Sequence, residues 1–442
     1  MSAYPVDLSN VLENAWDSNR QGIEPPPVLP PKANLIQLLD SAYHASFLTE
    51  EGRNLRFRIA VMPEHSPKTK SHFGELFQGA KVPFTNPRVL NTNEIRRLAP
   101  ATDFTQTIIC VELRKQKGKM IWVVWGLLDT GTTWWDYLKE GTVDGLVPPN
   151  VLTITSVEPG NLTISREGRV VVVLRNGSIS TPGDSLLYAG ALFEFFKPAI
   201  NQLKEDVSKR VRNHAKLIDE YDDRSAISLY IGFIEKILFY TQQKRHGGTF
   251  LFIPDTVDPT DTRLADRIKI KYSTAYYHIW ENLILAAELD RIYFHLKYEE
   301  TQNGKLKETN NQWRIVEDTR DGMEDFERQV RDGAKFIASL TGVDGAVVIT
   351  DKFRVYGFGA EVIATSPSLN EVKIAADNAG RKGAGQNIET YGTRHRSAFR
   401  FCSSYENSVA FVISQDSGLK AIKRIGSDVI MWGDANISNQ SV

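Results

Sequence analysis

Two short motifs near the C-terminus hold the residues of this chain that are best suited to chemistry. The first is Asp344-Gly345-Ala346, and the second is Gly392-Thr393-Arg394-His395-Arg396-Ser397-Ala398. The second motif places two guanidinium groups, an imidazole and two hydroxyl groups within five consecutive residues, a density that suits a polyanion. Arginine bonds phosphate oxygens two at a time, and an aspartate can hold a divalent metal ion beside them. The two motifs therefore predict a site for a nucleoside triphosphate and its metal.

Regular elements are expected on both sides of these motifs. A helical pattern over residues 323–340 stops just before Asp344, and an apolar strand over residues 346–350 follows. Another apolar strand, over residues 409–414, ends in Ser414. Small residues at a strand end let a ligand approach the backbone. A single Asp-Gly-Ala tripeptide occurs by chance, so the prediction depends on the combination of both motifs with these strands.

The combination resembles the catalytic domain of diadenylate cyclases, which join two ATP molecules into cyclic di-AMP and release two pyrophosphates. The resemblance covers residues 225–430 loosely and residues 335–425 well. It implies that Asp344 binds Mg²⁺ or Mn²⁺ beside the attacking ribose 3'-hydroxyl, and that Arg394 and Arg396 stabilise charge on the phosphates. The other nucleotide-binding residues that it implies are Gly345, Ala346, Thr393, His395, Ser397, Ser414 and Gln415. Contacts to adenine are expected from the region of Gly359 and Glu361.

The implied reaction is an attack by the 3'-hydroxyl of one ATP on the α-phosphorus of the other. Such a transfer needs positioning and charge stabilisation more than covalent chemistry. The product is two-fold symmetric, and each domain of this family holds one ATP. Two copies should therefore meet face to face, as a homodimer or a higher homo-oligomer, and the monomer is expected to be inactive.

Two departures from the family pattern bear on the metal site. Val343 stands where membrane-anchored members usually have histidine, and Gln415-Asp416 stands where they tend to carry two acidic residues. Asp416 is thus a second candidate metal ligand, and Gln415 is more similar to the DNA-scanning branch of the family. The alternative function is a degenerate member that binds a nucleotide or cyclic dinucleotide without turnover. The retained Asp344 and both arginines favour the enzyme, and a scaffolding role would explain neither motif.

The segment between the two motifs is longer than the family minimum. Its extra residues, 365–389, include the glycine-rich and basic run 378–385. This run lacks the Gly-Lys-Ser/Thr end of a P-loop. It could fold over phosphates as a lid or form a mobile surface loop, and the sequence leaves both open.

Composition and charge limit the other functions. The 442 residues are 41% hydrophobic and 24% charged, with a formal net charge of -1, which gives no general attraction to nucleic acid or membrane. Cys110 and Cys402 lie too far apart for a zinc or disulfide framework, which favours a reducing, cytoplasmic location. The longest apolar run, residues 120–128, is far shorter than the roughly 20 residues that span a bilayer. A soluble protein is therefore expected.

The expected architecture is a multidomain α/β (α+β) chain in which a mixed central sheet flanked by helices forms the catalytic domain. Within that domain, the pattern predicts a helix over residues 273–290 and a strand over residues 291–298. The predicted parts are a Pro-rich N-terminal arm (1–32), a β-rich sensor domain (33–182), a helical connector (183–224), the catalytic domain (225–432) and a disordered tail (433–442).

The front half is similar to the N-terminal sensor domains predicted for some soluble diadenylate cyclases. Two segments carry this second resemblance, Phe73-Gly74-Glu75-Leu76-Phe77 and Arg96-Arg97-Leu98-Ala99-Pro100-Ala101, and a tryptophan-rich strand follows them. The resemblance implies that an unknown ligand of the sensor domain regulates the catalytic domain.

Overall fold

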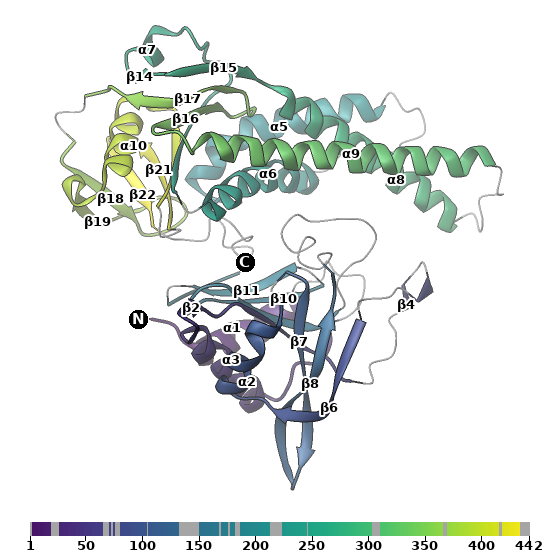
Figure 1. Ribbon diagram of the computed structural model, residues 1–442. Helices are drawn as coiled ribbons and strands as arrows, with labels where there is room; N and C mark the ends of the chain where they lie inside the picture. The colour runs from purple at the N-terminus through teal and green to yellow at the C-terminus, as the bar shows by residue number, and fades with distance from the viewer. Residues whose placement is uncertain are drawn as a thin grey trace. The chain divides into compact units, whose positions relative to one another are not determined.

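The computed structural model of the chain describes residues 2–18, 26–64, 70–71, 74–75, 80–103, 105–131, 150–167, 169–175, 177–181, 186–212, 223–244, 246–302, 310–365, 369–414 and 418–433. The chain divides into two compact units, with the boundary between Asp184 and Ser185. The architecture is mixed α/β, with a β-rich first unit and helices in the middle of the chain, as predicted. Figure 1 shows the elements of both units.

The first unit is built on an eight-stranded sheet in the order β12-β11-β10-β9-β3-β7-β8-β6. Its strands are β3 (Phe57–Val61), β6 (Ala80–Val89), β7 (Thr107–Gln116), β8 (Lys119–Asp129), β9 (Leu152–Ser156), β10 (Leu162–Arg166), β11 (Arg169–Arg175) and β12 (Ser178–Ser180). Two short pairs lie outside it: β1 (Thr49–Glu50) with β2 (Arg53–Asn54), and β4 (Lys70–Ser71) with β5 (Gly74–Glu75). β3 and β7 are parallel, and the other paired neighbours in the large sheet are antiparallel.

Helices cover one face of this sheet and bury its apolar side chains. They are α1 (Pro5–Ser18), α2 (Lys32–Ser46), α3 (Thr92–Leu98) and the 3₁₀ turn η1 (Ala99–Ala101). Leu8, Leu12 and Trp16 of α1 are buried in the same core as the sheet residues Ile59 and Ile154. The separate arm predicted for residues 1–32 is therefore corrected. The spacing of these three side chains gives α1 an apolar stripe, which packs on the first unit instead of extending away from it.

The second unit is built on a ten-stranded sheet in the order β14-β17-β16-β13-β20-β21-β22-β18-β19, with β15 paired to β17. Its strands are β13 (Gly248–Ile253), β14 (Ile268–Lys269), β15 (Tyr272–Tyr276), β16 (Ala346–Thr350), β17 (Val355–Val362), β18 (Glu371–Ala375), β19 (Lys382–Asn387), β20 (Val409–Ile413), β21 (Leu419–Ile425) and β22 (Asp428–Trp432). The pairs β13–β16 and β18–β22 are parallel, and the others are antiparallel.

Both faces of this sheet are covered, which explains why its central strands are apolar throughout. The long helices α5 (Ala191–Arg212), α6 (Asp223–Gln243), α8 (His278–Gln302) and α9 (Asn310–Leu340) gather on one side, and α10 (Thr393–Ser404) lies on the other (Figure 1). The short helices are α7 (Thr262–Ala265) and η3 (Ile388–Thr390). Along β13, Phe250 and Phe252 enter the core beneath the long helices, and Leu251 and Ile253 enter the core beneath α10.

Three predictions of local structure are wrong. Residues 291–298 lie within α8, which packs against α9, so helix pairing prevails over the strand-forming tendency of this aromatic stretch. The helix predicted from residue 273 begins only at His278, because β15 precedes it and pairs with β17. α5 carries Phe196 and Leu203 into the core of the second unit, so it is part of that unit and not a connector. The predicted tail beyond Gly433 lies outside the described residues.

Candidate functional site

The two motifs meet at one edge of the second sheet, where β13 and β16 begin and β20 ends. Gly248 pairs with Ile413 across β13 and β20, and Phe250 pairs with Val347 across β13 and β16. Continuing both registers past the strand ends places Gly247 between Ser414 and Asp344. Because neighbouring strands are about 4.8 Å apart, Asp344 and Ser414 lie about 10 Å from each other.

Asp344 is exposed at this edge, in the bend between α9 and β16. Its carboxylate forms no ion pair or hydrogen bond with any described residue. Gly345 follows with a φ of 119°, and a Cβ atom there would lie 2.6 Å from the carbonyl carbon of Gly359 on β17. Gly345 is therefore required for the close approach of β17 as well as for its own backbone conformation. The structure brings Asp344, Gly345 and Gly359 together.

The second motif reaches the same edge through the first turn of α10. The helix begins at Thr393 after Gly392, whose position provides no side-chain cap, so the first N–H groups remain available. Nη1 of Arg394 donates to the carbonyl oxygen of His246 at 3.1 Å. A Cβ atom on Gly247, which has a φ of 70°, would lie 2.8 Å from the same Nη1. The guanidinium of Arg394 thus lies next to Gly247, the residue between Asp344 and Ser414.

The remaining residues of the second motif are arranged around this turn. Nη1 of Arg396 donates to Oε2 of Glu389 at 2.6 Å, in a pair exposed to solvent. Thr393 is exposed, and Ser397 is half-buried. The ring of His395 lies 5.7 Å from that of Tyr391, between centroids, so this imidazole contributes to packing.

Other predicted residues are spread along the adjoining strands. Ser414 closes a turn, because its Oγ accepts the Gly418 N–H at 3.1 Å. Ala346 is buried in β16, so only its backbone could meet a ligand. Glu361 is exposed on β17, paired with Lys269 of β14, and lies two residues beyond Gly359. Gln415 and Asp416 lie outside the described residues.

Asp344 is the one carboxylate within the two motifs. Among the described residues, no group of three or more histidine, cysteine, aspartate or glutamate side chains could hold a metal ion. Mg²⁺ is commonly bound by one or two carboxylates together with substrate phosphates. Asp344 therefore fits a divalent ion that arrives with a nucleotide better than a resident metal.

Sequence reasoning missed two residues that border this corner, Lys271 and Tyr272. A Cβ atom on Gly359 would lie 3.3 Å from the Tyr272 ring, and 3.3 Å from the side chain of Val343, which precedes Asp344. The Tyr272 ring is stacked on Phe358 with 5.0 Å between centroids, and Tyr272 is 44% exposed. The ammonium of Lys271 lies 5.3 Å from the same ring. Residues 268–271 alternate apolar and basic side chains, a pattern typical of a strand, and this pattern ends just before β15 (Tyr272–Tyr276).

The glycine-rich segment left open as a lid or a mobile loop forms the hairpin β18–β19 at the end of the sheet. β18 pairs with β22, and the Trp432 indole of β22 donates to the carbonyl oxygen of Asp377 at 2.9 Å. The backbone N–H of Arg381 donates to the Asp377 carboxylate at 2.9 Å. Gly380 is packed so closely that a Cβ atom would lie 2.9 Å from the Trp432 ring. The sheet therefore fixes this segment as an edge hairpin.

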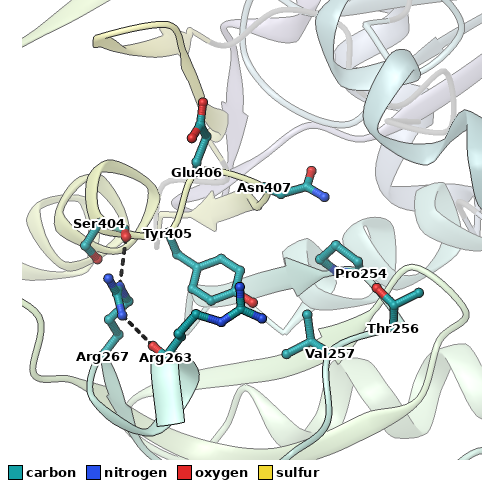
Figure 2. Close-up of a pocket in the computed structure, with 9 residues that line it drawn as sticks. All are labelled: Pro254, Thr256, Val257, Arg263, Arg267, Ser404, Tyr405, Glu406 and Asn407. Atoms are coloured by element: carbon teal, nitrogen blue, oxygen red, sulfur yellow. Dashed lines mark hydrogen bonds between the residues drawn. The ribbon is translucent and has the colours of Figure 1, made fainter. Parts of the chain in front are cut away.

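A cavity of about 350 Å³ lies at the opposite end of β13 (Figure 2). It is lined by Pro254, Thr256, Val257, Arg263, Arg267, Ser404, Tyr405, Glu406 and Asn407. None of these residues belongs to the motifs found in the sequence, although Ser404 ends the helix α10 that the second motif begins. The cavity is thus separate from the edge that gathers Asp344 and Arg394.

Comparison with known families bears on the first unit. A family profile described as "Probable sensor domain DACNV" matches residues 24–129, which include α2 and the strands β3, β6, β7 and β8. This sensor domain occurs in diadenylate cyclase proteins, so the resemblance seen in the front half is confirmed for these residues. No curated protein matches the chain. Within the described residues, no helix has the length and apolar character needed to cross a membrane.

Proposed function

We propose that this chain is a diadenylate cyclase in which the first unit acts as a regulatory sensor domain. The observation that carries the proposal is the arrangement at one edge of the second sheet. There, the exposed Asp344, the first turn of α10 with Arg394, and Ser414 surround Gly247. The DACNV match in the first unit supports the same conclusion independently, since that domain occurs in diadenylate cyclase proteins.

The chemistry of this edge suits the triphosphate of ATP. Free N–H groups and the positive end of the α10 dipole attract phosphate oxygens at the start of the helix. Arg394 is already oriented by its hydrogen bond to His246, so less rotamer freedom would be lost when it binds a phosphate. Arg396 would exchange or share its surface pairing with Glu389, which is weak because both groups are solvated.

Asp344 is the residue suited to the reacting end of the nucleotide. A divalent ion bound there with the nucleotide would neutralise phosphate charge and lower the pKa of the ribose 3'-hydroxyl. The carboxylate has no protein partner among the described residues, so no internal ion pair has to be broken for it to bind. Gly345 and Gly359 hold the two strands together behind it, which fixes the backbone on both sides of the carboxylate.

A single copy holds one ATP in this scheme, and a second copy must supply the other. The 3'-hydroxyl oxygen of one nucleotide attacks the α-phosphorus of its partner and releases its proton to solvent, the bond to pyrophosphate breaks, and the reciprocal step closes the ring. The exposed position of Asp344 leaves it accessible to such a partner. Ligand binding to the first unit would then regulate activity by favouring or opposing this pairing.

The test is product analysis on the full-length protein. Wild type, Asp344→Asn and the control Asp321→Asn are incubated with ATP and either Mg²⁺ or Mn²⁺, and products are resolved by mass. Asp321 is an exposed aspartate of α9 that pairs with Arg320, so it matches Asp344 in charge but lies outside the proposed site. Cyclic di-AMP from wild type and Asp321→Asn alone is the expected result.

Two outcomes would contradict this proposal. ATP binding without any cyclic di-AMP, at protein concentrations high enough for dimers, would replace the enzyme with a nucleotide-binding sensor. Specific activity that stays constant on dilution far below the dimer dissociation constant would remove the requirement for two copies.

A further inference from the structure

The cavity at the far end of β13 has the dimensions of a small-molecule site. Its volume of about 350 Å³ lies within the range of roughly 300–1,000 Å³ that is common for ligand pockets. The six residues of β13 separate it from Gly247, a distance of about 20 Å at the rise of a strand. A ligand here would not occupy the edge proposed for ATP.

One wall of this cavity is aromatic and held in place by its neighbours. The Tyr405 ring is stacked on the fully buried Phe401, with centroids 5.6 Å apart and ring planes within 7°. Nε of Arg267 donates to the carbonyl oxygen of Ser404 at 2.8 Å, and its Nη1 donates to that of Arg263 at 2.7 Å. These bonds tie α7 to the end of α10 (Figure 2). The wall is therefore formed before any ligand arrives.

The cavity also presents polar groups that form no hydrogen bond with the described residues. Arg263 donates through Nη2 to Asp261 at 2.7 Å and through Nε at 3.2 Å, and its Nη1 has no partner among the described residues. The side chains of Thr256 and Asn407 also form no hydrogen bond within the described part of the chain. Figure 2 places all three around the same space as the Tyr405 ring.

Charges of both signs lie at the cavity, and its free charged hydrogen-bond donor is a guanidinium nitrogen. Arg263 and Arg267 contribute two positive charges, and Asp261 and Glu406 contribute two negative ones. The carboxylate of Glu406 points away from the other lining residues in Figure 2. Burial raises the pKa of the Tyr405 phenol, so that group stays neutral and adds no negative charge at physiological pH.

We propose that this cavity binds a small anion with a planar ring, of the size of a nucleoside monophosphate. Nη1 of Arg263 would bond the anionic group, since a guanidinium is suited to phosphate or carboxylate oxygens. The ring would lie against Tyr405, and Thr256 and Asn407 would supply hydrogen bonds to its polar edge.

The helix α10 extends from this cavity to the edge proposed for ATP. The helix starts at Thr393, beside the edge proposed for ATP, and ends at Ser404, which lines the cavity. Its 12 residues span about 18 Å. The existence of the site does not rest on the proposed function, because none of the residues that contact the ligand in this scheme belongs to the ATP edge.

The experiment is a calorimetric titration of the full-length Arg394→Ala protein with AMP, adenosine and ribose 5-phosphate in turn. The Arg394→Ala background weakens nucleotide binding at the other edge. AMP is expected to bind at a single site, at least about tenfold more tightly than adenosine or ribose 5-phosphate, because each of these lacks one of the two recognised parts.

Adding Arg263→Gln should weaken AMP binding by about tenfold, whereas the control Arg354→Gln should leave it unchanged. Arg354 lies at the same end of the sheet and pairs with Asp255, outside the cavity.

Absence of AMP binding, or AMP binding that Arg263→Gln leaves unchanged, would overturn the proposal. Tyr405→Leu provides a second check, since loss of the ring should weaken AMP while leaving ribose 5-phosphate unaffected. Arg263 is an exposed side chain, so its replacement should not prevent folding, and thermal denaturation of each variant checks this. A protein that makes no cyclic di-AMP but binds AMP through Arg263 would contradict the cyclase and leave this site standing.

Discussion

Two clusters of polar residues, Asp344 with Arg394 at the beginning of β13 and Asp351 with Asp255 and Thr350 at its end, differ in how their hydrogen-bonding groups are paired. At the beginning of the strand, Asp344 has no hydrogen-bond or ion-pair partner among the described residues, and Arg394 donates to the backbone carbonyl of His246. At the end of the strand, Asp351 is 9% exposed and accepts the Asp255 N–H at 2.7 Å, while Thr350 donates to Asp255 at 3.0 Å. Asp344 is therefore free to bind a ligand, whereas Asp351 and Asp255 are hydrogen-bonded to neighbouring residues of the chain.

This difference separates function from stability within one sheet. Buried polar groups cost about 1–3 kcal/mol each when left without a hydrogen bond, so the network around Asp351 must be complete for the β16–β17 turn to form. An exposed carboxylate such as Asp344 carries no such requirement, because water solvates it until a ligand arrives. Substitution of Asp344 should therefore change activity, whereas substitution of Asp351 should change stability.

The largest expected effect is on turnover, from Asp344→Asn. We expect a loss of about 10³-fold in cyclic di-AMP formation, equal to about 4 kcal/mol of transition-state stabilisation, because the metal loses its protein carboxylate. The melting temperature should stay within about 1 °C of wild type, since the side chain has no partner to lose. Initial rates and thermal denaturation of the same preparations measure both. If Asp344→Asn lost stability as well as rate, the distinction between a functional cluster at Asp344 and a stabilising cluster at Asp351 would be wrong.

The next effect concerns the backbone behind that carboxylate. Gly345→Ala should lower the free energy of unfolding by about 2–4 kcal/mol, because its φ of 119° strains an alanine and its Cβ would collide with β17. Gly232→Ala is the matched control, since nothing lies within 4 Å of its Cβ position in α6 and alanine favours a helix by up to about 1 kcal/mol. Chemical denaturation should thus give opposite signs for the two variants. An unchanged free energy of unfolding in Gly345→Ala would mean that β17 does not pack closely against this glycine.

The elements at the edge proposed for ATP could largely be predicted from the sequence. Asp344 and Gly345 stand between a helix and an apolar strand, and Ser414 ends another apolar strand, as the structure has them. That Gly247 lies between them, or that Gly345 touches Gly359, could not be predicted. Both contacts arise from strand order and register between segments more than 10 residues apart, which no local pattern encodes.

The errors have a similar cause. The stretch 291–298 is rich in aromatic and β-branched residues, yet α8 continues through it because α9 packs alongside. The prolines after α1 favour an extended arm, but Leu8, Leu12 and Trp16 recur at helical spacing and pack into the core of the first unit. The cavity lined by Arg263 and Tyr405 left no sequence signal, since its residues come from three separate segments. Tertiary packing decided each case.

A smaller effect should appear in the pH dependence of stability, through Asp351 at the satisfied end. Burial, followed by the nearby charge of Asp255, raises its pKa to about 6, against about 3.9 for an unfolded aspartate. Between these pH values the native state keeps a proton that the unfolded state has lost, so this group's contribution to stability falls as pH rises from about 4 to about 6. Asp351→Asn keeps an acceptor for Asp255 and removes the titration. Relative to wild type, the variant should gain about 2 kcal/mol across this window, measured by urea denaturation at several pH values. An unchanged difference between pH 4 and 7 would contradict the raised pKa.

The smallest expected effect tests whether the binding site proposed at the beginning of β13 extends to the edge strand β15. The exposed Tyr272 ring stacks on Phe358 and closes the corner next to Gly359, so it offers a flat surface to the base of a nucleotide held by Asp344 and Arg394. If ATP binds there, Tyr272→Ala should raise its KM about five- to tenfold, equal to about 1 kcal/mol of stacking, with little change in kcat. Tyr272→Phe should keep the wild-type KM, because the ring remains. The control Tyr277→Ala removes a tyrosine that is also exposed and lies just past β15, and it should have no effect. A KM unchanged in Tyr272→Ala would confine the site to the strand ends around Gly247, whereas a rise shared with Tyr277→Ala would point to a general disturbance of β15.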